Sequence, residues 1–141
     1  MQRSDLDTRV VPTWRPDGAL AIEDPASFNV WLGRLEAADG MSIAGFDPML
    51  EALDRRHAAF HEAGCRASDH GLEQIYAEPW SDADVAAAFD KVRRGQSIDA
   101  HEVLRYKSAL LATFFDRLDD TNQLTKTILY NLRATTSCSR P

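Results

Sequence analysis

The chain has 141 residues, of which 44% are hydrophobic, and its 16 basic and 22 acidic residues give a formal net charge of −6. This length suits one domain with its own core but excludes a closed eight-stranded α/β barrel, which needs ~250 residues. The negative charge argues against a nucleic-acid partner, because phosphate binding requires a concentrated basic face. Since no run of about 20 apolar residues is present, we expect no membrane partner.

The two cysteines, Cys65 and Cys138, lie far apart, and no apolar stretch follows the first five residues. A secretory leader would place a run of apolar residues there. We therefore expect reduced thiols and a cytoplasmic protein.

The N-terminal part of the chain predicts a strand followed by a helix. Residues 10–14 are β-branched and aromatic, as in strands, and residues 15–18 form a turn-like Arg-Pro-Asp-Gly sequence. Asp24 caps the predicted helix, Pro25 takes its first position, and Gly40 lies beyond its end.

The middle of the chain predicts two further helices. Asp47-Pro48 resembles the opening at Asp24-Pro25, and Gly64 ends that second helix. Residues 65–71 are ambiguous between a strand and a loop. Ser81 opens the third helix as a cap. Its inward residues are Val85, Ala88, Phe89 and Val92.

The C-terminal part predicts a fourth helix and a buried strand. Asp99 and Glu102 have capping-box spacing, and residues 127–132 are a mainly apolar run. Residues 133–141 lack apolar periodicity, and we expect them to be disordered. The fourth helix's inward residues are Val103, Leu104, Leu110, Leu111, Phe114, Phe115 and Leu118.

Three candidates have the chemistry of a site, and each has a structural alternative. His57 and His61 share a helix face and, with Cys65, have the spacing of metal ligands, yet such a pair is also common in helix packing. Asp69-His70 at a strand end suits acid–base chemistry, or else forms a solvated turn. Arg15 either clamps a carboxylate or packs on Trp14.

Three segments resemble uronate isomerases, also called glucuronate isomerases: Val11–Asp17 (VPTWRPD), Arg56–Glu73 (RHAAFHEAGCRASDHGLE) and Phe115–Leu132. The resemblance implies an amidohydrolase-like (β/α)8 barrel, of which residues 1–132 would be one partial domain. It also implies interconversion of D-glucuronate with D-fructuronate and of D-galacturonate with D-tagaturonate. It assigns substrate binding to Arg15 and catalysis to Asp69 and His70.

The resemblance also implies what this chain omits. The family binds a divalent metal such as zinc through His-x-His and Thr-Asp-Ser-Arg motifs that have no counterpart here, so we expect no metal in this chain. The junction within residues 108–115 resembles an internal deletion. We expect a helix-dominated α/β fragment with four helices and two or three short, parallel strands. The alternative to a hexuronate isomerase is an inactive remnant that self-associates through exposed apolar faces.

Overall fold

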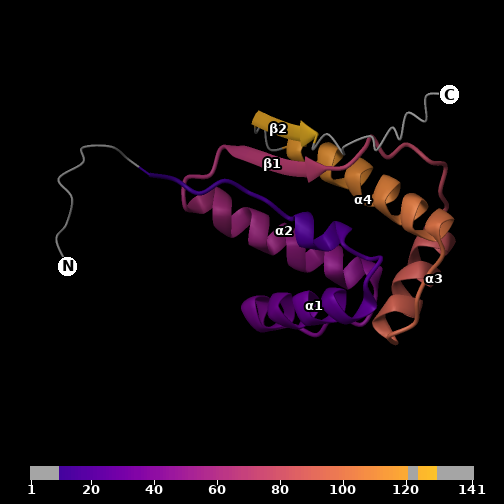
Figure 1. Ribbon diagram of the computed structural model, residues 1–141. Helices are drawn as coiled ribbons and strands as arrows, with labels where there is room; N and C mark the ends of the chain where they lie inside the picture. The colour runs from indigo at the N-terminus through magenta and orange to yellow at the C-terminus, as the bar shows by residue number, and fades with distance from the viewer. Residues whose placement is uncertain (1–9, 121–123, 130–141) are drawn as a thin grey trace, which may run out of the picture.

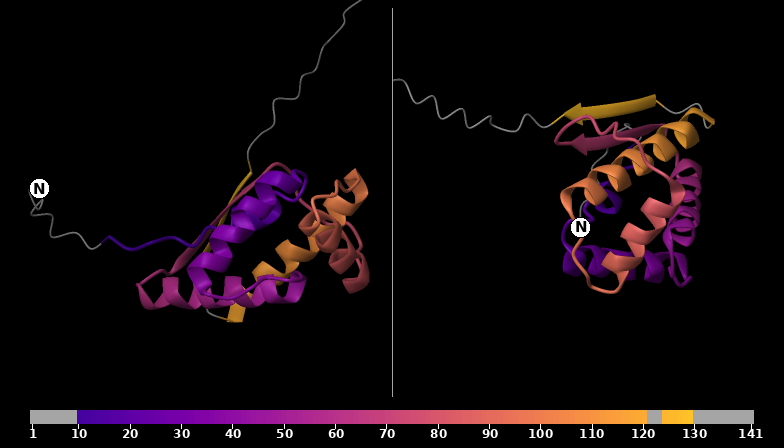
Figure 2. Two further views of the ribbon diagram at one scale, coloured as in Figure 1. Left: turned by 90° about the horizontal axis from the view of Figure 1, so that it is seen from below. Right: turned by 90° about the vertical axis from the view of Figure 1, so that its right-hand side faces the viewer.

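The computed structural model describes the backbone of residues 10–120 and 124–129 and the side chains of residues 10–116. Figures 1 and 2 show β1 and β2 side by side, with α1 and α3 away from them. The two strands are parallel, so the predicted helix-dominated α/β class is confirmed. The elements are the 3₁₀ helix η1 (Asp17–Leu20), α1 (Pro25–Asp39), α2 (Phe46–Glu62), β1 (Ala67–Leu72), α3 (Asp82–Arg93), α4 (Ala100–Asp120) and β2 (Leu124–Leu129).

The predicted strand over residues 10–14 is too long, because Trp14 alone pairs, through a parallel bridge to Ser68. The Trp14 amide donates to the Ala67 carbonyl at 3.0 Å, and the Asp69 amide donates to the Trp14 carbonyl at 2.9 Å. Pro12 has no amide hydrogen to extend this pairing. The bridge still sets the chain after Trp14 beside β1.

The start of α1 is confirmed, whereas the predicted start of α2 is wrong. Asp24 accepts hydrogen bonds from the first-turn amides of α1, and Gly40 follows the helix with a φ of 70°. α2 begins at Phe46, because extended Gly45 rather than Asp47 is its N-cap residue. Pro48 falls in the first turn, where no helical partner is needed for an amide.

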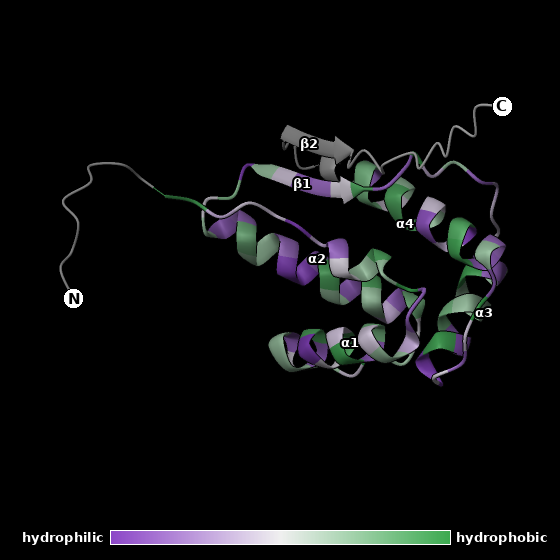
Figure 3. Cartoon of the chain, in the orientation of Figure 1, coloured by the Kyte–Doolittle hydropathy of each residue, from purple (hydrophilic) through white to green (hydrophobic). Residues whose placement is uncertain are grey.

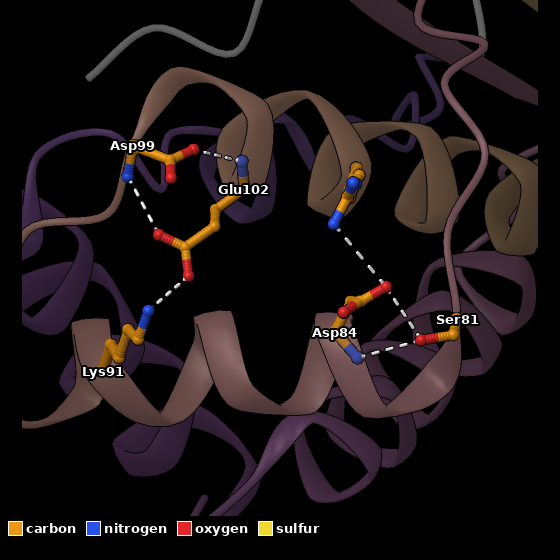
Figure 4. A network of polar contacts seen from close by, with 6 residues as sticks. Ser81, Asp84, Lys91, Asp99 and Glu102 are labelled. Atoms are coloured by element: carbon orange, nitrogen blue, oxygen red, sulfur yellow. Dashed lines mark hydrogen bonds and ion pairs between the residues drawn. The ribbon is translucent and has the colours of Figure 1, made fainter.

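Side-chain caps start α3 and α4 as predicted (Figure 4). The Ser81 hydroxyl accepts from the Asp84 amide at 3.2 Å. Asp99 and Glu102 form a reciprocal box, each carboxylate accepting from the other residue's amide at 2.9 Å. Lys91 of α3 also donates to Glu102, so this box joins the two helices.

The helices enclose one apolar core. Hydrophilic and hydrophobic residues alternate along α2 and α4 (Figure 3), as expected for helices with one buried side. All four residues predicted to face inward from α3 are buried. In α4 the prediction missed Tyr106, which is fully buried and whose hydroxyl donates to the Ala19 carbonyl at 3.0 Å.

The strand predicted over residues 127–132 begins earlier, since β2 covers Leu124–Leu129 and pairs in register with Ala67–Leu72. Residues 130–132 and the tail 133–141 lie outside the described residues. None of the described helices is long and apolar enough to cross a membrane.

The Tyr106 hydrogen bond predicts a clear stability loss in Tyr106→Phe. The substitution leaves the buried Ala19 carbonyl without its donor, so we expect a loss of about 1–2 kcal/mol in the free energy of unfolding. Urea denaturation measures it. Tyr76→Phe is the control, because Tyr76 is half-buried and its hydroxyl makes no hydrogen bond with a described residue; equal losses would contradict the prediction.

The α3–α4 junction predicts a pH-dependent stability. The hydrogen bond from Lys91 lowers the pKa of Glu102 below its ordinary value of 4.5. The ionised Glu102 carboxylate therefore stabilises the fold fully above pH 4.5, and this stabilisation is lost as the pH falls through the lowered pKa. We expect Glu102→Ala to cost about 1 kcal/mol at pH 7 and less near pH 3. Urea denaturation at pH 7 and pH 3 measures this loss. Glu51→Ala, at an exposed helical glutamate, is the control and should show a smaller loss that does not depend on pH in this way.

Candidate active site

The Trp14 side chain positions the candidate site. It is 8% exposed and packs against α2, with ring centroids 5.2 Å from Phe60 and 5.6 Å from His57. Arg15 follows directly, so its side chain leaves the chain next to β1. The side chain of Arg15 is 44% exposed, which keeps it accessible from solvent.

Asp17 connects the groups around it. Its Oδ2 accepts from Arg15 Nε at 3.0 Å and from the Gly71 amide at 2.8 Å. Its Oδ1 lies 3.6 Å from His70 Nδ1, which is longer than a normal hydrogen bond. One carboxylate thus joins η1, the arginine and β1.

The close approach of Gly18 to α1 fixes the position of η1. A Cβ on Gly18 would lie 2.3 Å from Trp31 Nε1, a distance that no side chain tolerates. The absence of a Cβ therefore lets η1 pack directly on the indole ring. This contact holds Asp17, the preceding residue, against β1.

Asp69 lies beside Arg15, as the predicted site requires. Asp69 Oδ2 is 3.8 Å from Arg15 Nη1, and the Asp69 side chain is 23% exposed. Its Oδ1 is buried without a hydrogen-bond partner. An unpaired buried carboxylate oxygen beside a guanidinium is suited to receiving a proton or a hydroxyl donor from a ligand.

His70 lies on the other side of β1, because successive strand residues point to opposite faces. Its ring is fully buried, stacked on Phe114 at 5.8 Å and edge-on to Phe115 at 6.1 Å. Neither ring nitrogen has a hydrogen-bond partner. The structure therefore brings Arg15 and Asp69 together and places His70 behind them, in contact with Asp17.

The charge of Asp17 is favoured by its neighbours. Burial alone would raise the pKa of this carboxyl, but the contacts with His70, the Gly71 amide and Arg15 lower it overall. Asp17 therefore stays ionised near neutral pH.

A cavity of about 140 Å³, bounded also by Tyr76, adjoins Asp17 and Gly71.

The alternative metal site at His57, His61 and Cys65 is not supported. Among residues 10–116, no group of three or more His, Cys, Asp or Glu side chains is placed to hold a metal ion. Cys65 is buried, and its thiol lies 3.2 Å from the Ala67 carbonyl. His57 packs on Trp14, and the His61 carbonyl accepts from Arg66, so packing explains this segment.

Sequence reasoning missed Asp17 as a site residue. It assigned residues 15–18 to a turn, and Asp in a turn is ordinary. The available signal was the Arg-Pro-Asp-Gly sequence, which sets a second charge two residues from Arg15. The contact with Gly71, 54 residues later in the chain, has no local signal.

Fold and site together define the class of protein: a parallel α/β unit whose charged site joins the residues after the Trp14 bridge to the middle of β1. Asp69 and His70 therefore lie inside β1 and not at its end, contrary to the prediction. The family model for glucuronate isomerase matches residues 1–115. The chain belongs to the glucuronate isomerase family.

Curated relatives are uronate isomerases. That of Bacteroides thetaiotaomicron is 45% identical over 113 residues, covering 80% of this chain and 24% of the relative. That of Cellvibrio japonicus is 35% identical over 175 residues, covering 89% of this chain and 37% of the relative. The chain thus spans about a quarter to two fifths of their length. The second alignment is longer than the part of this chain that it covers, so about 50 of its positions have no counterpart here.

Solved structures of the family have the same fold over most of this chain. Uronate isomerase from Thermotoga maritima superposes with a TM-score of 0.78 at 27% identity, covering 83% of this chain and 26% of that one. Glucuronate isomerase from Caulobacter crescentus superposes with a TM-score of 0.72 at 22% identity, covering 83% of this chain and 24% of that one.

The contacts of Asp17 predict the effect of removing its charge. Asp17→Asn loses the ion pair with Arg15 and weakens the bond from Gly71, so we expect a loss of about 2 kcal/mol in the free energy of unfolding at pH 7. Because the folded-state pKa is lowered, the difference from wild type persists above pH 3.8 and shrinks below it. Urea denaturation at pH 7 and below pH 3.8 measures the loss in the free energy of unfolding. Asp116→Asn, at an exposed aspartate, is the control, and an equally small loss in Asp17→Asn would contradict the prediction.

Proposed function

We propose that this chain binds a hexuronate through Arg15 and catalyses its aldose–ketose isomerisation with Asp69. One observation carries the proposal: in a member of the glucuronate isomerase family, Arg15 Nη1 and Asp69 Oδ2 lie 3.8 Å apart on an accessible face. A guanidinium recognises carboxylate and oxyanion oxygens through paired hydrogen bonds, and a carboxylate transfers protons.

The chemistry requires both groups. A base takes the proton from C2 of the open-chain sugar acid, the electron pair forms a C1=C2 bond, and O1 gains the negative charge. Transfer of the O2 proton to O1, return of a proton to C1 and formation of the C2=O bond give the ketose, with no net gain or loss of atoms. Asp69 acts as the base, and Arg15 stabilises a negatively charged oxygen of the bound sugar acid. Asp17 holds the guanidinium through Nε.

His70, which the family resemblance assigns to catalysis, is fully buried, and we propose it as a positioning residue. A ring that is fully enclosed and contacts Asp17 acts by orienting that carboxylate and, through it, Arg15. The substrates proposed are the glucuronate–fructuronate and galacturonate–tagaturonate pairs. The fold proposed is part of an eight-stranded (β/α)8 barrel, in which β1 and β2 are two neighbouring strands.

The divalent metal that the family resemblance implies does not fit the described residues. Within 10–116, Asp17 and Asp69 are the carboxylates that contact Arg15, and they are not part of any three-ligand group. We therefore assign no step of the reaction to a metal held by these residues.

A non-catalytic interaction module is the second candidate function. It is favoured by apolar side chains that remain in water, since Val10 is 90% and Ile75 77% exposed. Exposed apolar side chains favour association of the chain with another protein that has an apolar surface, including a second copy of itself.

The test is conversion of D-glucuronate to its keto form by the purified chain, followed by NMR, with binding measured by calorimetry. We expect Arg15→Met to weaken glucuronate binding about tenfold to hundredfold, as expected for loss of a charge-assisted contact, and to abolish turnover. Arg34→Met, on an exposed arginine of α1, is the matched control.

Each outcome decides between the two candidates. Turnover that depends on Arg15 and Asp69 but not on Arg34 supports the isomerase. Absence of both binding and turnover, together with self-association in sedimentation velocity, would overturn it in favour of the interaction module.

A further inference from the structure

A second cavity, of about 470 Å³, lies away from Arg15 and Asp69, between the start of α2, the start of α3 and the later part of α4. Cavities of this size hold small organic ligands. It shares no lining residue with the smaller cavity beside Asp17. Nothing in the proposed isomerisation uses it.

The wall of this cavity is apolar and well supported. Phe46 lines it and packs edge-on against Tyr106 at 5.6 Å, so the wall continues into the core. Trp80 stands on the other side, 42% exposed. Its indole ring makes no ring contact or hydrogen bond with any described residue, so a ring face is available to a ligand.

The rim of the cavity is acidic. Asp47, Asp82 and Asp90 line it, and no lysine or arginine does. Asp47 and Asp82 form no ion pair with a described residue, while Asp90 has a loose contact with Arg94 at 3.7 Å. The N-termini of α2 and α3 each contribute roughly half a positive charge. The three negative carboxylates outweigh them, so the net charge around the rim is negative.

We propose that this cavity binds an organic cation with an apolar body, such as a protonated arylalkyl amine. The apolar part would stack on Trp80 and fill the space beside Phe46, and the ammonium group would lie among the carboxylates of Asp47 and Asp82. An ammonium ion beside an indole ring gains cation–π attraction in addition to the charge attraction. The same chemistry rejects anions, so hexuronates do not compete for this cavity.

The test titrates the full-length chain with phenethylamine, following tryptophan fluorescence and amide NMR shifts. We expect saturable binding with shifts at the start of α2 and α3. Phenylpropionate, of similar size but negatively charged, should bind at least tenfold more weakly. Equal binding of the two probes, or no saturable binding of phenethylamine, would overturn the proposal.

Variants locate the site. Asp82→Asn removes one rim charge and should weaken phenethylamine binding about threefold, the usual effect of an exposed charge pair, and Trp80→Ala should weaken it further. Glu51→Gln removes an exposed charge from α2 outside the cavity and should leave binding unchanged. Circular dichroism confirms that each variant is folded; unchanged binding in folded Trp80→Ala and Asp82→Asn would refute the assignment.

Discussion

The hydrogen bond from the Gly71 amide to the Asp17 carboxylate is the contact on which the candidate site depends. It joins the segment after Trp14 to the second half of β1, across 54 residues of sequence. The same oxygen receives Arg15 Nε, so the arginine is placed by the carboxylate that also anchors the loop. The backbone pairing of Trp14 with Ala67 and Asp69 is a further contact between the same two segments.

The helices α1 and α2 maintain this contact by packing. Trp31 of α1 meets the backbone of Gly18, and Phe60 of α2 meets the ring of Trp14. These two aromatic contacts lie on either side of Arg15 along the chain. The helices therefore give the site its geometry, although none of their residues forms its charged part.

Most of the helix boundaries follow from local residues, and this is why the sequence predicts them. The caps Asp24, Ser81 and Asp99 each bind amides two or three residues away, so their signals lie within a single turn. Pro48 was misleading because proline is tolerated throughout a first turn and does not fix which residue begins the helix.

The strands and the site were less predictable because they depend on distant partners. β1 has a polar sequence, and it becomes a strand by pairing with β2, more than 50 residues later. Asp17 gains its role from Gly71, and Tyr106 is buried because its hydroxyl reaches Ala19, 87 residues earlier. Arg15 and Asp69 were identified through the family resemblance, whereas their spacing alone left both open to ordinary structural roles.

The alternation of side chains along β1 has a consequence for how a short chain of this family behaves in water. Ser68, His70 and Leu72 are buried, so the other face of the strand carries Ala67, Asp69 and Gly71. In a closed α/β barrel, the inner face is filled mainly by valine, isoleucine and leucine. A face of alanine, aspartate and glycine offers little apolar area, so contact with solvent costs little hydrophobic free energy. The small and charged residues of the candidate site thus also make this face a poor surface for aggregation.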